Sequence, residues 1–386
     1  MTARLSPRQI LDRLVAFPTV SRDSNLPLID WVEDYLDSHD VTAQRVWNAD
    51  RTKASLYAQI GPAVAGGVIL SGHTDVVPVD GQPWSSDPWT VTERDGRLYG
   101  RGTCDMKGFV ALALAAVPLA LAADIKRPLQ LALSHDEEVG CTGAPAMIAE
   151  MARRLPRAAA VIVGEPSRFS VVTGHKGGTG FKVHVKGHEV HSSLIHTGVS
   201  AIMAAAPLID FANRVNAANA ARPPAALAQL FDPPWTTLHV GMVEGGTAHN
   251  ITAADCRFSI EFRVVPGEDI EDRVAEFARQ VARAVGTMQA IRPETGITLE
   301  RFFSVPPLRP EAKGAAEALV RRLTGDNGIH VVSCGTEAGQ FQAEGYSAVV
   351  CGPGDIAQAH QPDEYLELSQ FNAGWSFMQR LVAVLT

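Results

Sequence analysis

The sequence contains few cysteines, and no two of them stand at the CxxC spacing of a redox or zinc motif. The five residues are Cys104, Cys141, Cys256, Cys334 and Cys351. A small, odd number of scattered cysteines argues against a disulfide scaffold and indicates a reducing compartment.

Positive charge and long hydrophobic runs are also scarce. Lys and Arg number 34 against 42 Asp and Glu, so the net charge is −8 and no basic excess is available for nucleic acid. The longest apolar run, residues 109–123, contains Pro118 and falls short of the roughly 20 residues that cross a membrane, so we interpret it as a buried helix. Residues 1–10 lack the apolar core of a signal peptide. We therefore expect a cytoplasmic protein that binds neither nucleic acid nor membranes.

Local motifs for phosphate binding and serine hydrolysis are missing as well. The chain has no Walker lysine motif and no G-x-S-x-G elbow. Residues 352–357 imitate a dinucleotide fingerprint, but Pro353 and the lack of a following apolar helix argue against that function. The 386 residues, 46% apolar and 20% charged, are typical of a globular protein of two or three domains.

Short apolar runs alternate with helical segments in the outer parts of the chain. The runs cover residues 68–70, 129–133, 159–163 and 348–351. The helical segments cover residues 27–37, 109–123, 144–154 and 312–323. Runs of this kind are typical of strands buried on both faces of a parallel sheet. We predict an α/β domain with a mostly parallel central sheet flanked by helices.

The middle of the chain has a different pattern. Residues 180–186 and 256–265 alternate strictly between apolar and polar side chains, as half-exposed antiparallel strands do. Amphipathic helices are expected at about 199–217 and 270–285. The order of strand, helix, strand, strand, helix and strand predicts a small α+β, ferredoxin-like domain.

Two stretches bound this middle part and are interpreted as hinges. Residues 174–180 are rich in glycine, and residues 306–310 are rich in proline. We therefore expect a catalytic domain that a lid domain interrupts. The expected bounds are residues 1–175 and 304–386 for the catalytic domain and residues 176–303 for the lid.

Polar side chains follow each of the predicted buried strands, and one more precedes the apolar helix. They are His73 and Asp75, Glu137 and Glu138, Glu165, His360, and Asp105 before the helix. Ligands bind beyond the carboxyl ends of the strands in open α/β sheets, so we expect these groups to converge at one edge. Each alone has an ordinary alternative, such as a loop hydrogen bond or a helix cap, and only the convergence favours a site.

Carboxylate and imidazole groups without thiolates suit zinc, cobalt or manganese, and zinc fits best. A catalytic zinc keeps about three protein ligands, so five ligands fit two ions that share a carboxylate, roughly 3.5–4 Å apart. Glu165 directly follows a buried strand, where a carboxylate is costly unless it is paired or metal-bound.

These motifs resemble the M20 family of di-zinc metallohydrolases. The matching stretches are residues 71–78, 100–108, 136–138 and 164–167. Within the family the chain is most similar to members that deacetylate N2-acetyl-L-ornithine. That similarity is carried by residues 335–338, 358–365 and 175–177.

The resemblance implies a ligand set. His73 and Glu165 would bind one zinc, Glu138 and His360 would bind the other, and Asp105 would bridge the two ions. Cobalt or manganese could substitute for zinc.

The resemblance also implies two catalytic roles in this part of the chain. Asp75 would hold the far nitrogen of His73. Glu137 would be the general base that deprotonates a zinc-bridged water, and the resulting hydroxide would attack the amide carbonyl.

Further roles concern the lid and the substrate. The family pattern implies a homodimer through the lid, with His191 reaching the partner's site; the alternative is a surface histidine on a turn. Asn250 and Arg263 are candidates for the substrate carboxylate, although Arg263 could equally be an ordinary exposed strand residue. Glu337 could face the side-chain amine of an ornithine-like substrate.

The resemblance therefore implies a cytoplasmic enzyme that converts N2-acetyl-L-ornithine to L-ornithine and acetate in arginine biosynthesis. One alternative is another M20 activity, on an N-acyl-amino acid, a succinylated diaminopimelate or a dipeptide. A second alternative is an inactive metal-binding relative. Cys141 either contacts the site or packs as a small hydrophobic residue.

Overall fold

The computed structural model describes residues 5–386, and the chain divides into two compact units. Unit 1 comprises Met1–Gly174, Leu308–Val331 and Thr336–Thr386, and unit 2 comprises His175–Pro307 and Val332–Gly335. Residues 175, 304–307 and 332–335 were expected in the catalytic domain but cluster with unit 2. The reason is local, because β12 (Gly296–Val305) continues along the unit 2 sheet to Val305, and the amide of Lys176 donates to the carbonyl of Val332 over 3.2 Å.

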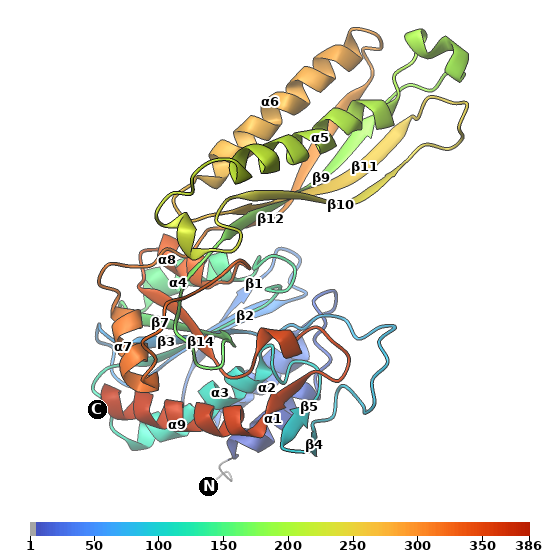
Figure 1. The fold of residues 1–386 in the computed structure, drawn as a ribbon. Coiled ribbons are helices and arrows are strands. Elements are labelled where there is room, and N and C mark those ends of the chain that lie inside the picture. The colour runs from blue at the N-terminus through green and yellow to red at the C-terminus, as the bar shows by residue number, and fades with distance from the viewer. Residues whose placement is uncertain (1–4) are drawn as a thin grey trace. The chain divides into compact units, whose positions relative to one another are not determined.

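Unit 1 is built on an eight-stranded sheet with the order β1-β2-β6-β3-β7-β14-β8-β13. The strands are β1 (Ala43–Trp47), β2 (Ala54–Ile60), β3 (Val68–His73), β6 (Leu129–Ser134), β7 (Ala160–Pro166), β8 (Val172–His175), β13 (His330–Val332) and β14 (Ala348–Gly352). The central strands β6, β3, β7 and β14 are parallel, while β2 and β8 add antiparallel neighbours. These four central strands are the four predicted apolar runs, and the predicted sheet flanked by helices is confirmed (Figure 1).

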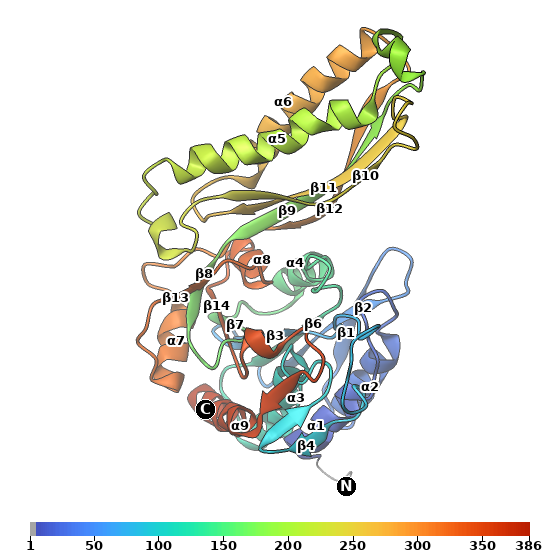
Figure 2. The same cartoon turned by 45° about the vertical axis from the view of Figure 1, so that its right-hand side comes forward.

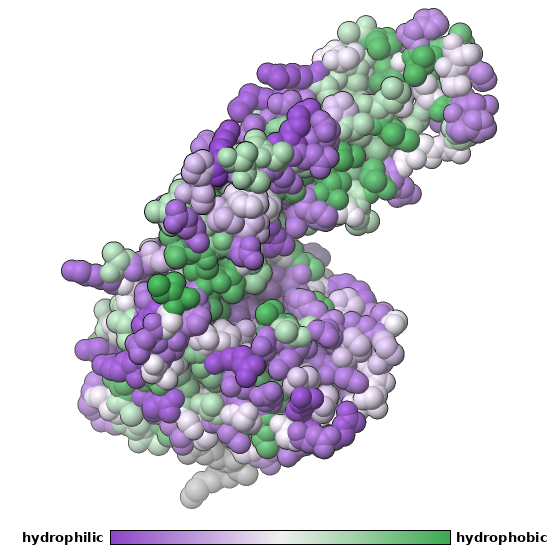
Figure 3. Space-filling view, viewed as in Figure 1, coloured by the Kyte–Doolittle hydropathy of each residue, from purple (hydrophilic) through white to green (hydrophobic). Residues whose placement is uncertain are grey.

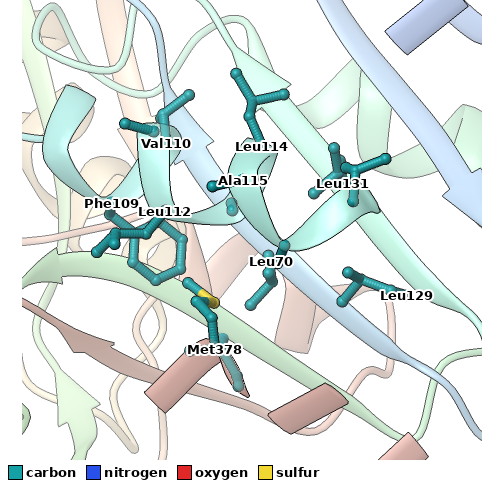
Figure 4. Packing of buried hydrophobic residues seen from close by; sticks show 14 of the residues in the cluster. Leu70, Phe109, Val110, Leu112, Leu114, Ala115, Leu129, Leu131 and Met378 are labelled. Atoms are coloured by element: carbon teal, nitrogen blue, oxygen red, sulfur yellow. The ribbon is translucent and has the colours of Figure 1, made fainter. Parts of the chain in front are cut away.

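Seven helices of unit 1 are α1 (Pro7–Val15), α2 (Leu26–Asp37), α3 (Lys107–Ala122), α4 (Ala144–Arg154), α7 (Ala315–Thr324), α8 (Ala338–Ala343) and α9 (Leu368–Leu385). α3 is apolar on all sides because it packs against the sheet and also against α1 and α9. Figure 4 shows Phe109 and Leu114 of α3 near Leu70 of β3 and Met378 of α9. Each fully buried side chain of this size contributes about 1.5–3 kcal/mol.

A small antiparallel sheet lies beside the site-bearing loops of unit 1. It consists of β15 (Tyr365–Glu367), β5 (Arg97–Tyr99) and β4 (Thr92–Arg94), and the sequence patterns did not predict it. Residue pairs such as Tyr365 and Tyr99 align the two strands. The pairing therefore ties the chain just after His360 to the chain just before Asp105.

Unit 2 has an antiparallel sheet with the order β10-β11-β9-β12. Its elements are β9 (Gly177–Lys186), η1 (Ser192–Thr197), α5 (Ala201–Ala220), η2 (Ala228–Leu230), β10 (Thr237–Gly245), β11 (Asp255–Val264), α6 (Ile270–Gln289) and β12. The predicted order of strands and helices is found, and both helices lie on one face of the sheet (Figure 2). Phe262 of β11 contacts Phe277 of α6, with ring centroids 6.0 Å apart.

None of the helices in residues 5–386 is both long enough and apolar enough to cross a membrane.

Candidate active site

The five residues proposed as metal ligands meet at one edge of the unit 1 sheet. His73 is the last residue of β3, and Glu165 lies near the end of β7. Glu138 follows β6, and His360 follows β14 and the short helix η3 (Ile356–Gln358). Asp105 lies just before α3. Parallel β6, β3, β7 and β14 all end at this edge, which is the physical reason for the convergence.

Asp105 lies between two imidazoles. Its Oδ1 is 3.0 Å from Nε2 of His73, and its Oδ2 is 3.2 Å from Nε2 of His360. On the first side, Glu165 Oε1 lies 3.8 Å from the same nitrogen of His73. On the second side, Glu138 Oε2 lies 3.0 Å from His360 Nε2. The two oxygens of one carboxylate therefore face two separate acid–imidazole pairs.

The site concentrates negative charge away from water. Burial, together with Asp105 and Glu137, raises the pKa of Glu165 well above its usual value. Burial also raises the pKa of Glu137 to about 8, and the neighbouring Glu138 and Glu337 add to this effect. Burial and then Asp105 raise the pKa of Glu138. Carboxylates in such a place require positive partners.

The pKa values of the two imidazoles are raised as well, which favours their charged form. Hydrogen bonds to Asp105 and Glu138 raise the pKa of His360 to about 10. Burial opposes a charge on His73, but Asp105 and Glu165 outweigh it and its pKa is raised. Burial likewise opposes ionisation of Asp105, but the hydrogen bonds from both histidines outweigh it and lower its pKa. Protons on the histidines thus balance part of the charge of the acids.

The donor set fits divalent cations. The ligand atoms of His73, Glu137 and Glu165 lie within 4.8 Å of one another, and so do those of His73, Asp105 and Glu138. Oε1 of Glu165 is buried and has no hydrogen-bond partner, as a metal ligand would be without its ion. Oxygen and imidazole donors without thiolates are suitable for zinc, cobalt or manganese.

Asp75 contacts the site differently from the expected arrangement. Nδ1 of His73 donates to the backbone carbonyl of Asp75 over 2.8 Å, whereas the nearest carboxylate oxygen is 3.7 Å away. That bond keeps Nε2 of His73 available as a ligand. The carboxylate instead accepts from Ser21 Oγ at 2.7 Å and from the amides of Glu137 and Glu138 at 3.1 and 3.3 Å. Asp75 therefore holds the loop that carries the proposed base.

Two further contacts fix the same loop. Asp136 has a left-handed backbone (φ 56°), and its carboxylate pairs with Lys53 at 2.6 Å. The thiol of Cys141 donates to Oε1 of Glu137. Cys141 is buried, so it both packs and contacts the site.

Glu337 lies at the start of α8 and is buried. Its carboxylate accepts hydrogen bonds from Ser71 Oγ at 3.0 Å and from Ser134 Oγ. Burial raises its pKa, although both serines favour the ionised form. Ser71 precedes His73 by two residues, so this carboxylate adds negative charge beside the proposed metal ligands.

The three other proposed residues belong to unit 2. His191 caps η1, and its side chain accepts from the amide of Ser193 at 3.2 Å. Its backbone forms an isolated antiparallel β-bridge with Ile251, which is next to Asn250. Arg263 lies near the end of β11 and pairs with Glu261 at 3.3 Å. Asn250 precedes the start of β11, so Asn250 and Arg263 lie towards opposite ends of this strand and are not neighbours within unit 2.

Sequence reasoning missed a buried ion pair beneath the loops of the site. Arg101 is fully buried and pairs with Glu364 at 2.7 Å. Arg101 falls inside the motif of residues 100–108, and a buried arginine needs a partner. Its partner lies 263 positions away, however, and no spacing rule identifies it.

Comparison with known proteins agrees with this geometry. Residues 69–384 match the peptidase family M20/M25/M40. The chain is 36% identical over 390 residues to an acetylornithine deacetylase of Myxococcus xanthus, with 97% of this chain and 96% of that protein covered.

Solved structures share the fold. An M20 family metallo-carboxypeptidase from Sulfolobus solfataricus superimposes with a TM-score of 0.78 at 18% identity, covering 98% of both chains. A dinuclear metal-binding peptidase of the M20 family from Bacillus subtilis gives a TM-score of 0.66 at 15% identity, covering 98% of this chain and 97% of that one. A family match that spans most of the chain and an acid–imidazole cluster at the expected sheet edge lead to one conclusion: the chain belongs to the peptidase family M20/M25/M40 of metal-binding hydrolases.

Proposed function

We propose that this protein is a di-zinc amide hydrolase that converts N2-acetyl-L-ornithine to L-ornithine and acetate. The observation that carries the proposal is the position of Asp105, whose two oxygens face His73 on one side and His360 on the other. The substrate is supported by the 36% identity to the Myxococcus xanthus acetylornithine deacetylase across nearly the whole chain.

The ligands in this proposal follow the two sides of Asp105. His73 and Glu165 hold one ion, Glu138 and His360 hold the other, and Asp105 contacts both. When bound, the zinc ions would lower the pKa of a water molecule towards about 7 and polarise the amide carbonyl. Cobalt or manganese could take the place of zinc, because both bind the same oxygen and imidazole ligands.

Glu137 is the proton carrier in this proposal. Bound cations would favour its ionised form, which can accept a proton from the attacking water and pass it to the leaving amine. The thiol of Cys141 donates a hydrogen bond to Oε1 of Glu137 and helps to orient the carboxylate. Asp75 fixes the backbone of the base by accepting its amide.

Recognition of the substrate is assigned to Glu337, Asn250 and Arg263. The negative charge of buried Glu337 favours a substrate with a cationic side chain. Asn250 and Arg263 are assigned to the substrate carboxylate, since a guanidinium matches a carboxylate well.

A homodimer through unit 2 is part of the proposal, with His191 serving the partner's site. β10 is an edge strand of the unit 2 sheet, and edge strands are ready to pair with another chain. Apolar side chains are exposed on this strand and on α5, including Met242 (74% exposed) and Met203 (63%). Figure 3 shows such hydrophobic surface, in green, on unit 2. A cytoplasmic location and a place in arginine biosynthesis complete the proposal.

The proposal is tested by measuring metal content and substrate preference on the same preparation. We expect two zinc ions per chain and faster turnover of N2-acetyl-L-ornithine than of N-acetyl-L-methionine, N-succinyl-diaminopimelate or a dipeptide. Glu137→Gln is the control, and it should lower kcat by about 100- to 10,000-fold while both ions stay bound. Faster turnover of any competing substrate would replace acetylornithine in the proposal, and no turnover of any of them would indicate an inactive relative.

A further inference from the structure

His360 is the least supported of the five proposed ligands. Its side chain is 50% exposed, whereas those of His73, Asp105 and Glu138 are 1%, 6% and 7% exposed. Its backbone is left-handed (φ 62°), a conformation that is unfavourable for residues other than glycine. An exposed, strained histidine in a loop must be held by contacts outside its own side chain.

Gln82 makes such a contact with the backbone of His360. Its Nε2 donates to the carbonyl of His360 over 3.0 Å. Its Oε1 accepts from Arg101 at 2.6 Å and from Nε1 of Trp84 at 3.0 Å. Two donors on the oxygen fix the orientation of the amide, so the nitrogen must face His360.

Arg101 connects this contact to the next residues of the same loop. Besides Gln82, its guanidinium donates to the carbonyl of Gln361 at 3.4 Å and pairs with Glu364 at 2.7 Å. The ring of Trp84 lies 5.0 Å from the guanidinium carbon. The arginine is fully buried, so its position is fixed by packing as well as by charge.

Glu364 extends the network to the segment that carries Asp105. Its carboxylate accepts from the amides of Gly102 at 3.1 Å, Cys104 at 2.9 Å and Asp105 at 3.0 Å. The carbonyl of His360 and the amide of Asp105 therefore belong to one hydrogen-bond network. The side chains of these same two residues approach to 3.2 Å.

A separate bond clamps the far end of the loop to the same segment. Asp363, which is also left-handed (φ 54°), accepts from the amide of Ser85 at 2.8 Å. Gln82 and Ser85 thus hold the His360 loop at two points. The two holding residues are three positions apart, and so are the two residues that they bond, His360 and Asp363.

We propose that Gln82 is a positioning residue for the metal ion bound by Asp105, Glu138 and His360, because it fixes the backbone of His360 and ties it through Arg101 and Glu364 to Asp105. The inference rests on the proposed two-metal function. It assigns a role to a segment, residues 82–85, that supplies no ligand itself.

The test compares three variants by metal binding. Gln82→Glu keeps the oxygen that accepts from Arg101 and Trp84 but replaces the donor to His360 with a second oxygen. Gln82→Ala removes both contacts without adding charge. Gln44→Glu is the matched control, since it makes the same amide-to-carboxylate change at an exposed side chain of β1, outside the network.

Zinc binding is measured by competition with a chromogenic chelator, and circular dichroism of the metal-free proteins checks the fold. In both Gln82 variants we expect the Kd of one of the two ions to rise about 10- to 100-fold, while the Kd of the other ion stays as in the wild type. The Gln44→Glu protein should bind both ions as the wild type does. In the Gln82 variants, kcat should return towards the wild-type value as zinc is raised, with KM unchanged.

Tight binding of both ions in either Gln82 variant would overturn the proposal. Equal weakening in Gln44→Glu, or a single bound ion in the wild type, would also overturn it. The proposed substrate can be contradicted independently of the role of Gln82. Wild-type protein that binds two ions but does not hydrolyse acetylornithine would contradict the substrate, while the chelator titration would still decide the role of Gln82.

Discussion

The thiol of Cys141 lies 3.2 Å from Oε1 of Glu137 and donates a hydrogen bond to it. The backbone of Cys141 is held as well, because its amide donates to the carbonyl of Glu137 at 2.8 Å and its own carbonyl accepts from Gln340 at 2.9 Å. The contact restricts the rotation of the carboxylate of the proposed base.

We expect Cys141→Ala to lower kcat about two- to fivefold with KM unchanged, since a weak thiol hydrogen bond contributes about 0.5–1 kcal/mol. Cys141→Ser retains a donor at the same place and should recover most of that loss. Steady-state kinetics on zinc-loaded protein make the comparison. Equal rates in the alanine and serine variants would show that the donor is irrelevant and that only packing matters.

A second prediction concerns Asp75, whose carboxylate accepts from the amides of both Glu137 and Glu138. Asp75→Asn places an NH2 group against one of these amides, so the base loop loses an acceptor. We expect kcat to fall about 10- to 100-fold, as for other residues that support a metal ligand. Ser21→Ala removes one of the three side-chain bonds to Asp75 and should have a smaller effect. A variant protein with wild-type kcat would contradict this role.

Glu337 provides a test of substrate charge. Glu337→Gln removes the negative charge but keeps an oxygen that can accept from Ser71 or Ser134. KM for N2-acetyl-L-ornithine should rise about tenfold, which corresponds to about 1.4 kcal/mol, because the cationic side chain loses an attraction. KM for N-acetyl-L-methionine, which has no such cation, should stay the same. An unchanged KM for acetylornithine would remove Glu337 from substrate recognition.

The metal-free protein should lose stability as the pH rises above neutrality. The pKa of His360 is raised from 6.5 to about 10, so its contribution to the free energy of unfolding is full below pH 6.5 and is lost as the pH approaches 10. The pKa of Glu137 is raised from 4.5 to about 8, so the stabilisation from its protonated form is full below pH 4.5 and disappears as the pH passes 8.

Thermal unfolding in the presence of a chelator should therefore give a lower Tm at pH 9 than at pH 7. Zinc must displace the proton of His360, so zinc affinity should increase over the same range and binding should release protons. Calorimetry in buffers of different ionisation enthalpy measures that release. A metal-free Tm that rises between pH 7 and pH 9 would disagree with these raised pKa values.

Local patterns were sufficient for the four central strands whose ends carry the site, but not for the small sheet of β4, β5 and β15 beside them. The apolar runs that form β3, β6, β7 and β14 are uninterrupted because both faces of each strand are buried. A short stretch of sequence is enough to recognise such a run. β1 and β13 were missed because they are short and none of their residues is fully buried, so they lack any apolar run. Their strand character comes from pairing with distant neighbours.

The site shows the same division between local and distant information. The sequence shows which side chains follow each strand, and the affinity of those groups for metal follows from their chemistry. His73 donates to the backbone carbonyl of Asp75 and not to its carboxylate. Nδ1 of His73 lies 2.8 Å from the carbonyl oxygen and 3.7 Å from the nearest carboxylate oxygen. No spacing in the sequence reports a difference of that size.

The sequence by itself determined the parallel sheet, the inserted α+β unit, and the acids and imidazoles offered at one edge, because hydrophobic periodicity and ligand chemistry are properties of nearby residues. Only the tertiary structure decided that Arg101 meets Glu364 and that Gln82 meets the carbonyl of His360. Those contacts join segments more than 250 positions apart, and they form because the packing of the whole sheet and its helices brings the loops together.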